Sequence, residues 1–195
     1  MHVCGVVLSG GKSSRMGKNK SLLTLQGKPV IERISSELQT CSSEVVVITN
    51  EPSLYSFLSL SLIKDRYLNK GPLAGIESAL YHVEADVYVF AACDMPFASE
   101  KVYGCLLNYM KGYDAVVPIY NNRIHPLSGI YRRSALPFVQ ESLDKDELKV
   151  KQFLDKIRVK YVNDYSTIPK EIVTKHFFNM NFPEQYEEAK GLSHE

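Results

Sequence analysis

The sequence lacks an excess of charge of either sign. Its 195 residues include 23 basic and 22 acidic side chains, which leave a formal net charge of +1. Proteins that bind nucleic acid or anionic membranes through a general electrostatic field are strongly basic, so this balance excludes such partners. Any anion site must be built locally. The composition, 45% hydrophobic and 23% charged, is that of an ordinary globular protein, and the length predicts one domain over residues 1–195.

The sequence also lacks the signatures of several other classes of protein. Its four cysteines form no C-x-x-C pair and its histidines do not cluster, so the ligand spacings of zinc sites are missing. The longest apolar run, residues 87–93, is far shorter than the roughly 20 residues of a membrane-spanning helix. The first residues lack the basic and apolar regions of a signal peptide. We therefore expect reduced cysteines and a cytoplasmic protein.

Short apolar runs alternate with segments of helical period, which is typical of a mainly parallel sheet covered by helices. The predicted strands are residues 3–8, 45–49, 62–64, 87–92, 115–119, 129–132 and 159–162. Several are apolar throughout, as expected for strands buried on both faces.

Predicted helices begin at Pro29 and Pro72, because proline suits the first helical position. Further helices are predicted over residues 135–143, 147–157 and 183–190. The pair Asn121-Asn122 predicts a chain reversal, which makes the sheet mixed. The expected fold class is α/β, with one Rossmann-like three-layer α/β/α domain.

A glycine-rich basic loop follows the first predicted strand, and residues 8–20 read LSGGKSSRMGKNK. Glycine backbone can approach a phosphate closely because no Cβ obstructs it. The spacing fits neither the G-x-G-x-x-G motif nor the Walker P-loop. Residues 1–31 carry five cations and no acid, so this segment has a charge of +5 and the remainder −4. A triphosphate would neutralise such a loop, and a solvated loop without a ligand is the alternative.

Two aspartates follow predicted strands. Asp94 emerges from strand 87–92, at the edge where open α/β sheets bind ligands, and could hold Mg²⁺ with phosphate oxygens. The alternative is that Asp94 caps a helix near Pro96. Asp65 follows strand 62–64 and precedes Gly71, which can bring backbone N–H groups to a ligand. This segment could bind a ribose or base, or could be an ordinary turn.

At these residues the sequence resembles the molybdenum cofactor guanylyltransferases, whose fold is a single domain of the nucleotide-diphospho-sugar transferase type. The shared motifs are LSGGKSSRMG at 8–17 followed by Lys20, GKP at 27–29, GPLAG at 71–75, CDMP at 93–96, HPLSGIY at 125–131 and NMNFPE at 179–184. The opening motif is common to many sugar and isoprenoid nucleotidyltransferases. GPLAG and the late Asn-x-Asn narrow the resemblance to this family.

The resemblance implies that molybdopterin attacks the α-phosphorus of GTP and releases pyrophosphate. It implies that Lys20, Arg15 and Asp94 are catalytic, and that Asp94 holds Mg²⁺ with Asn181 as a second metal ligand. The implied nucleotide-binding residues are Leu8, Ser9, Gly10, Gly11, Lys20, Asn50, Asp65, Gly71 and Asp94. The N-terminal half would bind GTP and Mg²⁺, and the C-terminal half molybdopterin.

The anionic pterin could be bound by Arg123, His125, Arg132 or Arg133. Arg132 and Arg133 alternate along a strand, so at most one faces a shared site, and both could be surface residues. His125 is expected to be a structural loop residue.

Three alternatives to a guanylyltransferase remain. One is a cytidylyltransferase acting on the same pterin, another is a sugar-phosphate nucleotidyltransferase, and the third is a nucleotide-binding module without catalysis. Lys20 together with Asp94 argues against the last, since binding alone does not need both. Docking to molybdoenzymes or other cofactor-biosynthesis proteins is compatible with the enzyme. A monomer is expected because no heptad seam is present.

Overall fold

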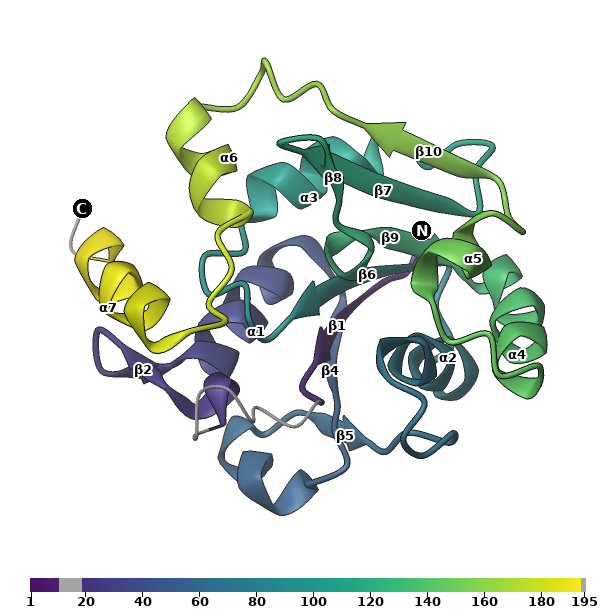
Figure 1. Cartoon of the computed structure of the whole chain (residues 1–195), viewed down its shortest axis with the longest axis horizontal. Coiled ribbons are helices and arrows are strands. Elements are labelled where there is room, and N and C mark those ends of the chain that lie inside the picture. The colour runs from purple at the N-terminus through teal and green to yellow at the C-terminus, as the bar shows by residue number, and fades with distance from the viewer. Residues whose placement is uncertain (11–18, 194–195) are drawn as a thin grey trace.

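A twisted sheet lies between two layers of helices in the computed structural model, which describes residues 1–10 and 19–193 (Figure 1). Over these residues the sheet has eight strands in the order β10-β7-β9-β6-β1-β4-β5, with β8 paired to β7. The strands are β1 (Val3–Leu8), β4 (Glu44–Ile48), β5 (Ser61–Ile63), β6 (Val87–Ala92), β7 (Ala115–Tyr120), β8 (Arg123–Ile124), β9 (Ile130–Arg132) and β10 (Val159–Val162).

Most neighbouring strands run parallel. β1 pairs in parallel with β4 and β6, as do β4 with β5 and β7 with β10. β9 is antiparallel to both β6 and β7, and β8 is antiparallel to β7. β6 and β7 therefore point the same way, and the carboxyl ends of all the parallel strands lie at one edge of the sheet. The predicted α/β fold with a mainly parallel, mixed sheet is confirmed.

Strand β1 shows why each face of the sheet carries a helical layer. All six of its residues are buried. Val3 and Val7 belong to one apolar cluster, whereas Cys4, Val6 and Leu8 belong to the other, because side chains alternate along a strand. The first cluster includes side chains of α1 (Val30–Cys41), α3 (Glu100–Leu107), α6 (Lys170–His176) and α7 (Pro183–Leu192). The second includes those of α2 (Pro72–His82), α4 (Leu136–Asp144) and α5 (Val150–Leu154).

The prediction that a helix begins at Pro29 is wrong by one residue. Pro29 ends a two-stranded ribbon of β2 (Thr24–Leu25) and β3 (Lys28–Pro29), and α1 begins at Val30. Gln26 and Gly27 form the turn of this hairpin, both with positive φ. Pairing of Pro29 with Thr24 holds the proline in an extended conformation, so it precedes the helix.

Two other predictions are confirmed, and one predicted helix is shorter than expected. Pro72 is the first residue of α2, and Asn121 and Asn122 both have positive φ in the β7–β8 reversal, as predicted. The helix predicted over residues 147–157 is limited to α5, because the Glu147 N–H bonds back to Ser142 and does not enter the helix. α3 and α6 were not predicted.

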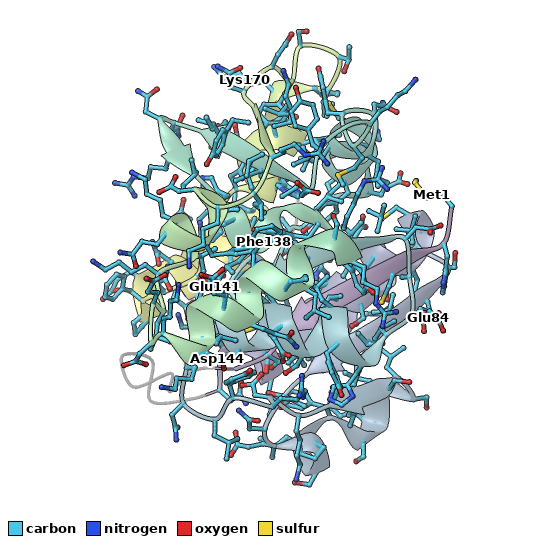
Figure 2. The ribbon with its side chains drawn as sticks, turned by 90° about the vertical axis from the view of Figure 1, so that its right-hand side faces the viewer. Met1, Glu84, Phe138, Glu141, Asp144 and Lys170 are labelled. Carbon is cyan, nitrogen blue, oxygen red and sulfur yellow. The ribbon has the colours of Figure 1, made fainter. Side chains whose placement is uncertain are left out.

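Figure 2 views the outer face of α4, along which Phe138, Glu141 and Asp144 follow one another. Asp144 ends this helix and accepts a hydrogen bond from the Tyr67 hydroxyl at 3.0 Å, so the segment after β5 lies against the end of α4. In the described part of the chain, no helix is long and apolar enough to cross a membrane. All four cysteines are free thiols.

Candidate active site

The residues that follow β1, β4 and β6 lie side by side at the carboxyl edge of the sheet. Ser9 donates its backbone N–H to Ile48 at 2.9 Å, and Cys93 donates to Leu8 at 3.2 Å. These bonds continue the sheet pairing past the ends of the strands. Gly10 stands in open space, with no neighbouring heavy atom within 4 Å of where a Cβ would be. The start of the glycine-rich segment, Ser9 and Gly10, therefore lies beside the segment that carries Asp94.

Lys20 and Asn181 meet beside Asp94, although they are 161 residues apart in sequence. Lys20 begins the short helix η1 (Lys20–Leu22), and its ammonium donates to Asn181 Oδ1 at 2.8 Å. The backbone N–H of Met180 donates to the Asp94 carbonyl at 2.8 Å, which places Asn181 next to the strand-end turn. Burial raises the pKa of Asp94, and the Lys20 charge partly offsets this by lowering it. The site thus pairs one cation with one carboxylate that is costly to ionise.

Asp94 does not cap a helix, so this alternative is wrong. The helix that follows is α3, and its cap is Ser99, whose Oγ accepts from the Lys101 N–H at 3.3 Å. Asp94 lies five residues earlier in a tight turn, where Met95 N–H donates to the Ala92 carbonyl at 3.1 Å. Its carboxylate is therefore available for another role.

Asn50 and Asp65 form a reciprocal pair beyond the ends of β4 and β5. Asn50 Nδ2 donates to Asp65 Oδ2 at 2.8 Å, and the Asp65 N–H donates to Asn50 Oδ1 at 3.1 Å. The other carboxylate oxygen, Asp65 Oδ1, is buried without a hydrogen-bond partner among the described residues. An unpaired buried acceptor costs roughly 1–3 kcal/mol, so a hydrogen-bond donor that reached this oxygen would stabilise the site.

Glycine at position 75 keeps α2 close to this oxygen. A Cβ on Gly75 would lie 2.9 Å from Leu8 Cδ2 and 3.8 Å from Asp65 Oδ1. Gly71, which precedes α2, has a φ of +69°, a conformation that side chains other than glycine rarely adopt. Gly71 is therefore required by its backbone conformation, whereas a side chain at position 75 would have to displace the end of the Leu8 side chain.

The segment after Asp65 is tied to α2 and α4. Arg66 donates its backbone N–H to Ser78 Oγ at 2.9 Å and its guanidinium to the buried carboxylate of Glu77. Gln140 donates to the same Glu77 oxygen at 2.9 Å. Burial raises the pKa of Asp65, the hydrogen bond from Asn50 lowers it, and the Glu77 charge raises it. The segment that the sequence offered as a ribose or base contact, or as an ordinary turn, is thus hydrogen-bonded to α2 and, through Tyr67, to α4.

Ser9 is used inside the protein. Its hydroxyl donates to the Tyr55 hydroxyl at 2.7 Å, and its N–H donates to the Ile48 carbonyl as described above.

Most residues of the predicted nucleotide-binding set lie along this edge or in the segment that leads to α2. These residues are Leu8, Ser9, Gly10, Lys20, Asn50, Asp65, Gly71 and Asp94. Gly11 and Arg15 lie outside the described residues.

The sequence analysis missed two buried side chains that support the site, namely Tyr55 and His176. Burial lowers the pKa of His176 to about 3, so the ring is neutral. Its Nδ1 accepts from the Ser99 N–H at 2.9 Å, and its Nε2 lies 2.9 Å from Ser128 Oγ. His176 therefore anchors the end of α6, from which the chain runs on to Asn181. The only sequence feature that could have indicated the buried position of His176 is its place beside apolar and aromatic residues.

Arg132 and Arg133 lie at the wrong end of the sheet for a shared site. Arg132 is opposite Val87, the first residue of β6, and its guanidinium donates to the carbonyls of Tyr113 and Met110. Arg133 follows in an exposed position. Because β9 is antiparallel to β6, its last residue reaches the amino edge, far from Asp94.

Arg123 and His125 do lie at the carboxyl edge, in and after β8. The His125 N–H donates to the Pro118 carbonyl at 2.9 Å, and its ring centroid is 4.7 Å from that of Phe177. Burial lowers the pKa of His125, so this ring packs as a neutral group. The expectation of a structural role for His125 is consistent with these contacts.

A sheet edge that gathers backbone N–H groups, an ammonium and strand-end carboxylates is the ligand-binding edge of nucleotide-binding α/β proteins. The family model described as "MobA-like NTP transferase domain" matches residues 5–160. The chain therefore belongs to the MobA-like NTP transferase family.

Individual relatives cover almost the whole chain. A protein of Carboxydothermus hydrogenoformans named "Probable molybdenum cofactor guanylyltransferase" is 37% identical over 182 residues, which are 93% of this chain and 91% of that protein. A Bacillus cereus protein of the same name is 37% identical over 198 residues and covers 98% of each chain. The crystal structure of molybdopterin-guanine dinucleotide biosynthesis protein A from Archaeoglobus fulgidus has a TM-score of 0.83 and 27% identity, with 97% of each chain covered.

Proposed function

We propose that this chain transfers GMP from GTP to molybdopterin, giving molybdopterin guanine dinucleotide and pyrophosphate. The observation that carries the proposal is the joining of Lys20, Asp94 and Asn181 at the same sheet edge as the Asn50–Asp65 pair. The names of the relatives support the choice of guanine and of the pterin over the alternatives.

The nucleoside binds, on this proposal, at the β4–β5 end of the edge. Guanine presents N1–H and an exocyclic amine as donors, and Asp65 Oδ1 is an acceptor without a partner among the described residues. Adenine has an acceptor at N1 in place of the guanine N1–H donor, so it would leave the Asp65 Oδ1 acceptor unmatched. An unmatched buried polar group costs about 1–3 kcal/mol, which is enough to rank the bases.

The oxygen atoms around Asp94 are suitable ligands for Mg²⁺. The site offers a carboxylate oxygen on Asp94 and an amide oxygen on Asn181, both hard ligands of the kind Mg²⁺ prefers, and the triphosphate and water would supply the rest. The raised pKa of Asp94 fits a carboxylate whose charge is to be neutralised by a cation. Asn181 Oδ1 accepts from Lys20 here, so its part in metal binding stays a prediction. Bound at Asp94, Mg²⁺ would offset charge on the triphosphate and polarise the α-phosphate.

The reaction needs no general base from the protein, since the attacking phosphate of molybdopterin is already an anion. It forms a bond to the α-phosphorus of GTP while the bond to the pyrophosphate oxygen breaks. The Lys20 ammonium, held by Asn181, stabilises the charge that moves onto the leaving group. Positioning of the two substrates supplies the remainder of the catalysis.

The acceptor binds, on this proposal, at the other end of the edge, toward the C-terminal half. Strand order places β7 and β8 on the far side of β6 from β4 and β5. Arg123 is exposed there and is the candidate for contact with the pterin phosphate.

The test incubates the protein with Mg²⁺, molybdopterin and each of the four nucleoside triphosphates, and measures pyrophosphate. We expect release with GTP only, and none when EDTA is added or the pterin is omitted. Release with CTP would identify a cytidylyltransferase. A GTP-dependent rise in thermal midpoint without pyrophosphate would identify a binding module.

A further inference from the structure

One buried hydroxyl joins the two ends of the segment that leads from β1 to Lys20. Tyr55, in the short helix η2 (Pro52–Leu58), is only 1% exposed. Its hydroxyl accepts from Ser9 Oγ at 2.7 Å and from Asn19 Nδ2 at 2.8 Å. It lies 2.8 Å from Ser21 Oγ.

The hydrogens of this cluster can be assigned by counting donors. Ser21 Oγ donates its single proton to Asn19 Oδ1 at 2.6 Å, and Ser9 donates to Tyr55. The contact between Tyr55 and Ser21 must then use the Tyr55 proton. The Tyr55 hydroxyl thus accepts two hydrogen bonds and donates one, so its hydrogen-bonding capacity is complete.

The cluster encloses the backbone of Lys20. Asn19 and Ser21 are its immediate neighbours, and Asn19 Oδ1 also accepts from the Ser21 N–H at 3.1 Å. The Lys20 side chain leaves this anchored backbone and reaches Asn181 Oδ1 at 2.8 Å. The Lys20 ammonium is therefore held by Asn181, and the backbone of Lys20 is held through the hydrogen bonds of its neighbours Asn19 and Ser21 with Tyr55.

We propose that Tyr55 is a positioning residue that sets where the Lys20 ammonium stands against the reacting phosphates. It touches no substrate and acts only through Asn19, Ser9 and Ser21. The inference rests on the proposed nucleotidyl transfer, because Lys20 must matter to that reaction for its position to matter. Tyr55 is far from the glycine-rich motif in the sequence, and no local pattern of residues indicates that the two are in contact.

Tyr55→Phe is the sharpest test, since it removes one oxygen and keeps the buried ring. Loss of the hydroxyl frees the base of Lys20, and a misplacement of about 1 Å lowers turnover by up to ~100-fold. We therefore expect kcat to fall about 10- to 100-fold, with less than a threefold change in KM for GTP. Tyr88→Phe is the matched control. Tyr88 is also fully buried, but its hydroxyl donates to Val83 at the amino edge, so kcat should not change.

A double-mutant cycle separates positioning from a general loss of structure. If Tyr55 acts through Lys20, Tyr55→Phe should lower kcat no further in a Lys20→Ala background. Equal fold losses in both backgrounds would overturn the proposal, as would wild-type kcat in Tyr55→Phe. If Tyr55→Phe does not fold, Ser21→Ala removes the acceptor of its proton and is measured in the same cycle. Absence of pyrophosphate release by the wild type would instead refute the proposed function.

Discussion

Asp94 and Asp114 flank neighbouring parts of the same sheet but serve opposite purposes. Asp114 precedes β7 at the amino edge, and its carboxylate accepts from Ser134 Oγ at 2.7 Å and from the backbone N–H and Nε of Arg158 at 3.1 Å each. Burial alone would raise the pKa of Asp114, but these hydrogen bonds lower it below its usual value. Asp94 follows β6 at the carboxyl edge, and its pKa is raised.

The difference shows which carboxylate the fold uses for stability. At Asp114 the protein supplies donors that favour the ionised form. At Asp94 burial disfavours the ionised form. The Lys20 charge and a backbone hydrogen bond favour that form, but they do not outweigh burial, so the pKa stays raised. A carboxylate that is buried at a free-energy cost, at the sheet edge where α/β proteins bind ligands, is a candidate functional residue.

The largest effect is expected from Asp94→Asn. Removing the charge should lower turnover by about 1,000-fold, the upper range for loss of one group that stabilises a transition state. The thermal midpoint should stay the same or rise, because the amide avoids the burial cost of the charged form. Pyrophosphate release and thermal unfolding measure the two quantities. Full activity at saturating Mg²⁺ would show that Asp94 holds no metal.

Lys20→Ala should lower kcat about 100-fold, because the ammonium acts where charge develops on the leaving pyrophosphate. Lys28→Ala is the control, since Lys28 is exposed in the β2–β3 hairpin. Steady-state kinetics with GTP distinguish the two variants. Equal losses would mean that the basic segment acts only through its total charge.

GTP should raise the thermal midpoint more than CTP, UTP or ATP. A ligand that binds only the folded state stabilises it by about 2.7 kcal/mol at one hundred times Kd. Because the triphosphate is common to all four, the ranking isolates the base, and Asp65→Ala should abolish it. Thermal shift assays with Mg²⁺ measure this ranking. A ranking that persists in the variant would place base recognition elsewhere.

Asp114→Ala should leave kcat unchanged and lower the free energy of unfolding by about 1–3 kcal/mol, because partners of a buried acceptor are left unpaired. The folded-state pKa of Asp114 lies below its unfolded value. Its contribution is therefore present above the ordinary aspartate pKa of about 4 and is lost as the pH falls through the folded-state pKa. Denaturant titrations at pH 7 and pH 3 should show a smaller difference between wild type and variant at pH 3.

The sheet could be predicted from sequence because its signals are local. β1, β6 and β10 have the predicted bounds, since apolar runs between polar turns define buried strands. α3 and α6 escaped prediction because they are short and their stability depends on packing. The hairpin at Gln26-Gly27 escaped because two residues per strand leave no alternation to detect.

The amino-acid sequence by itself predicted the layered α/β fold, and it predicted that Asp65 and Asp94 lie at one edge, because each follows a strand of the parallel arrangement. The role of Lys20 was implied by the family resemblance. Only the tertiary structure decided which side chains touch. Lys20 reaches Asn181 across 161 residues, and Tyr55 completes the hydrogen bonds of Ser9 and Asn19 from a separate helix. Such pairs arise when independently formed elements pack, so no local pattern of residues contains them.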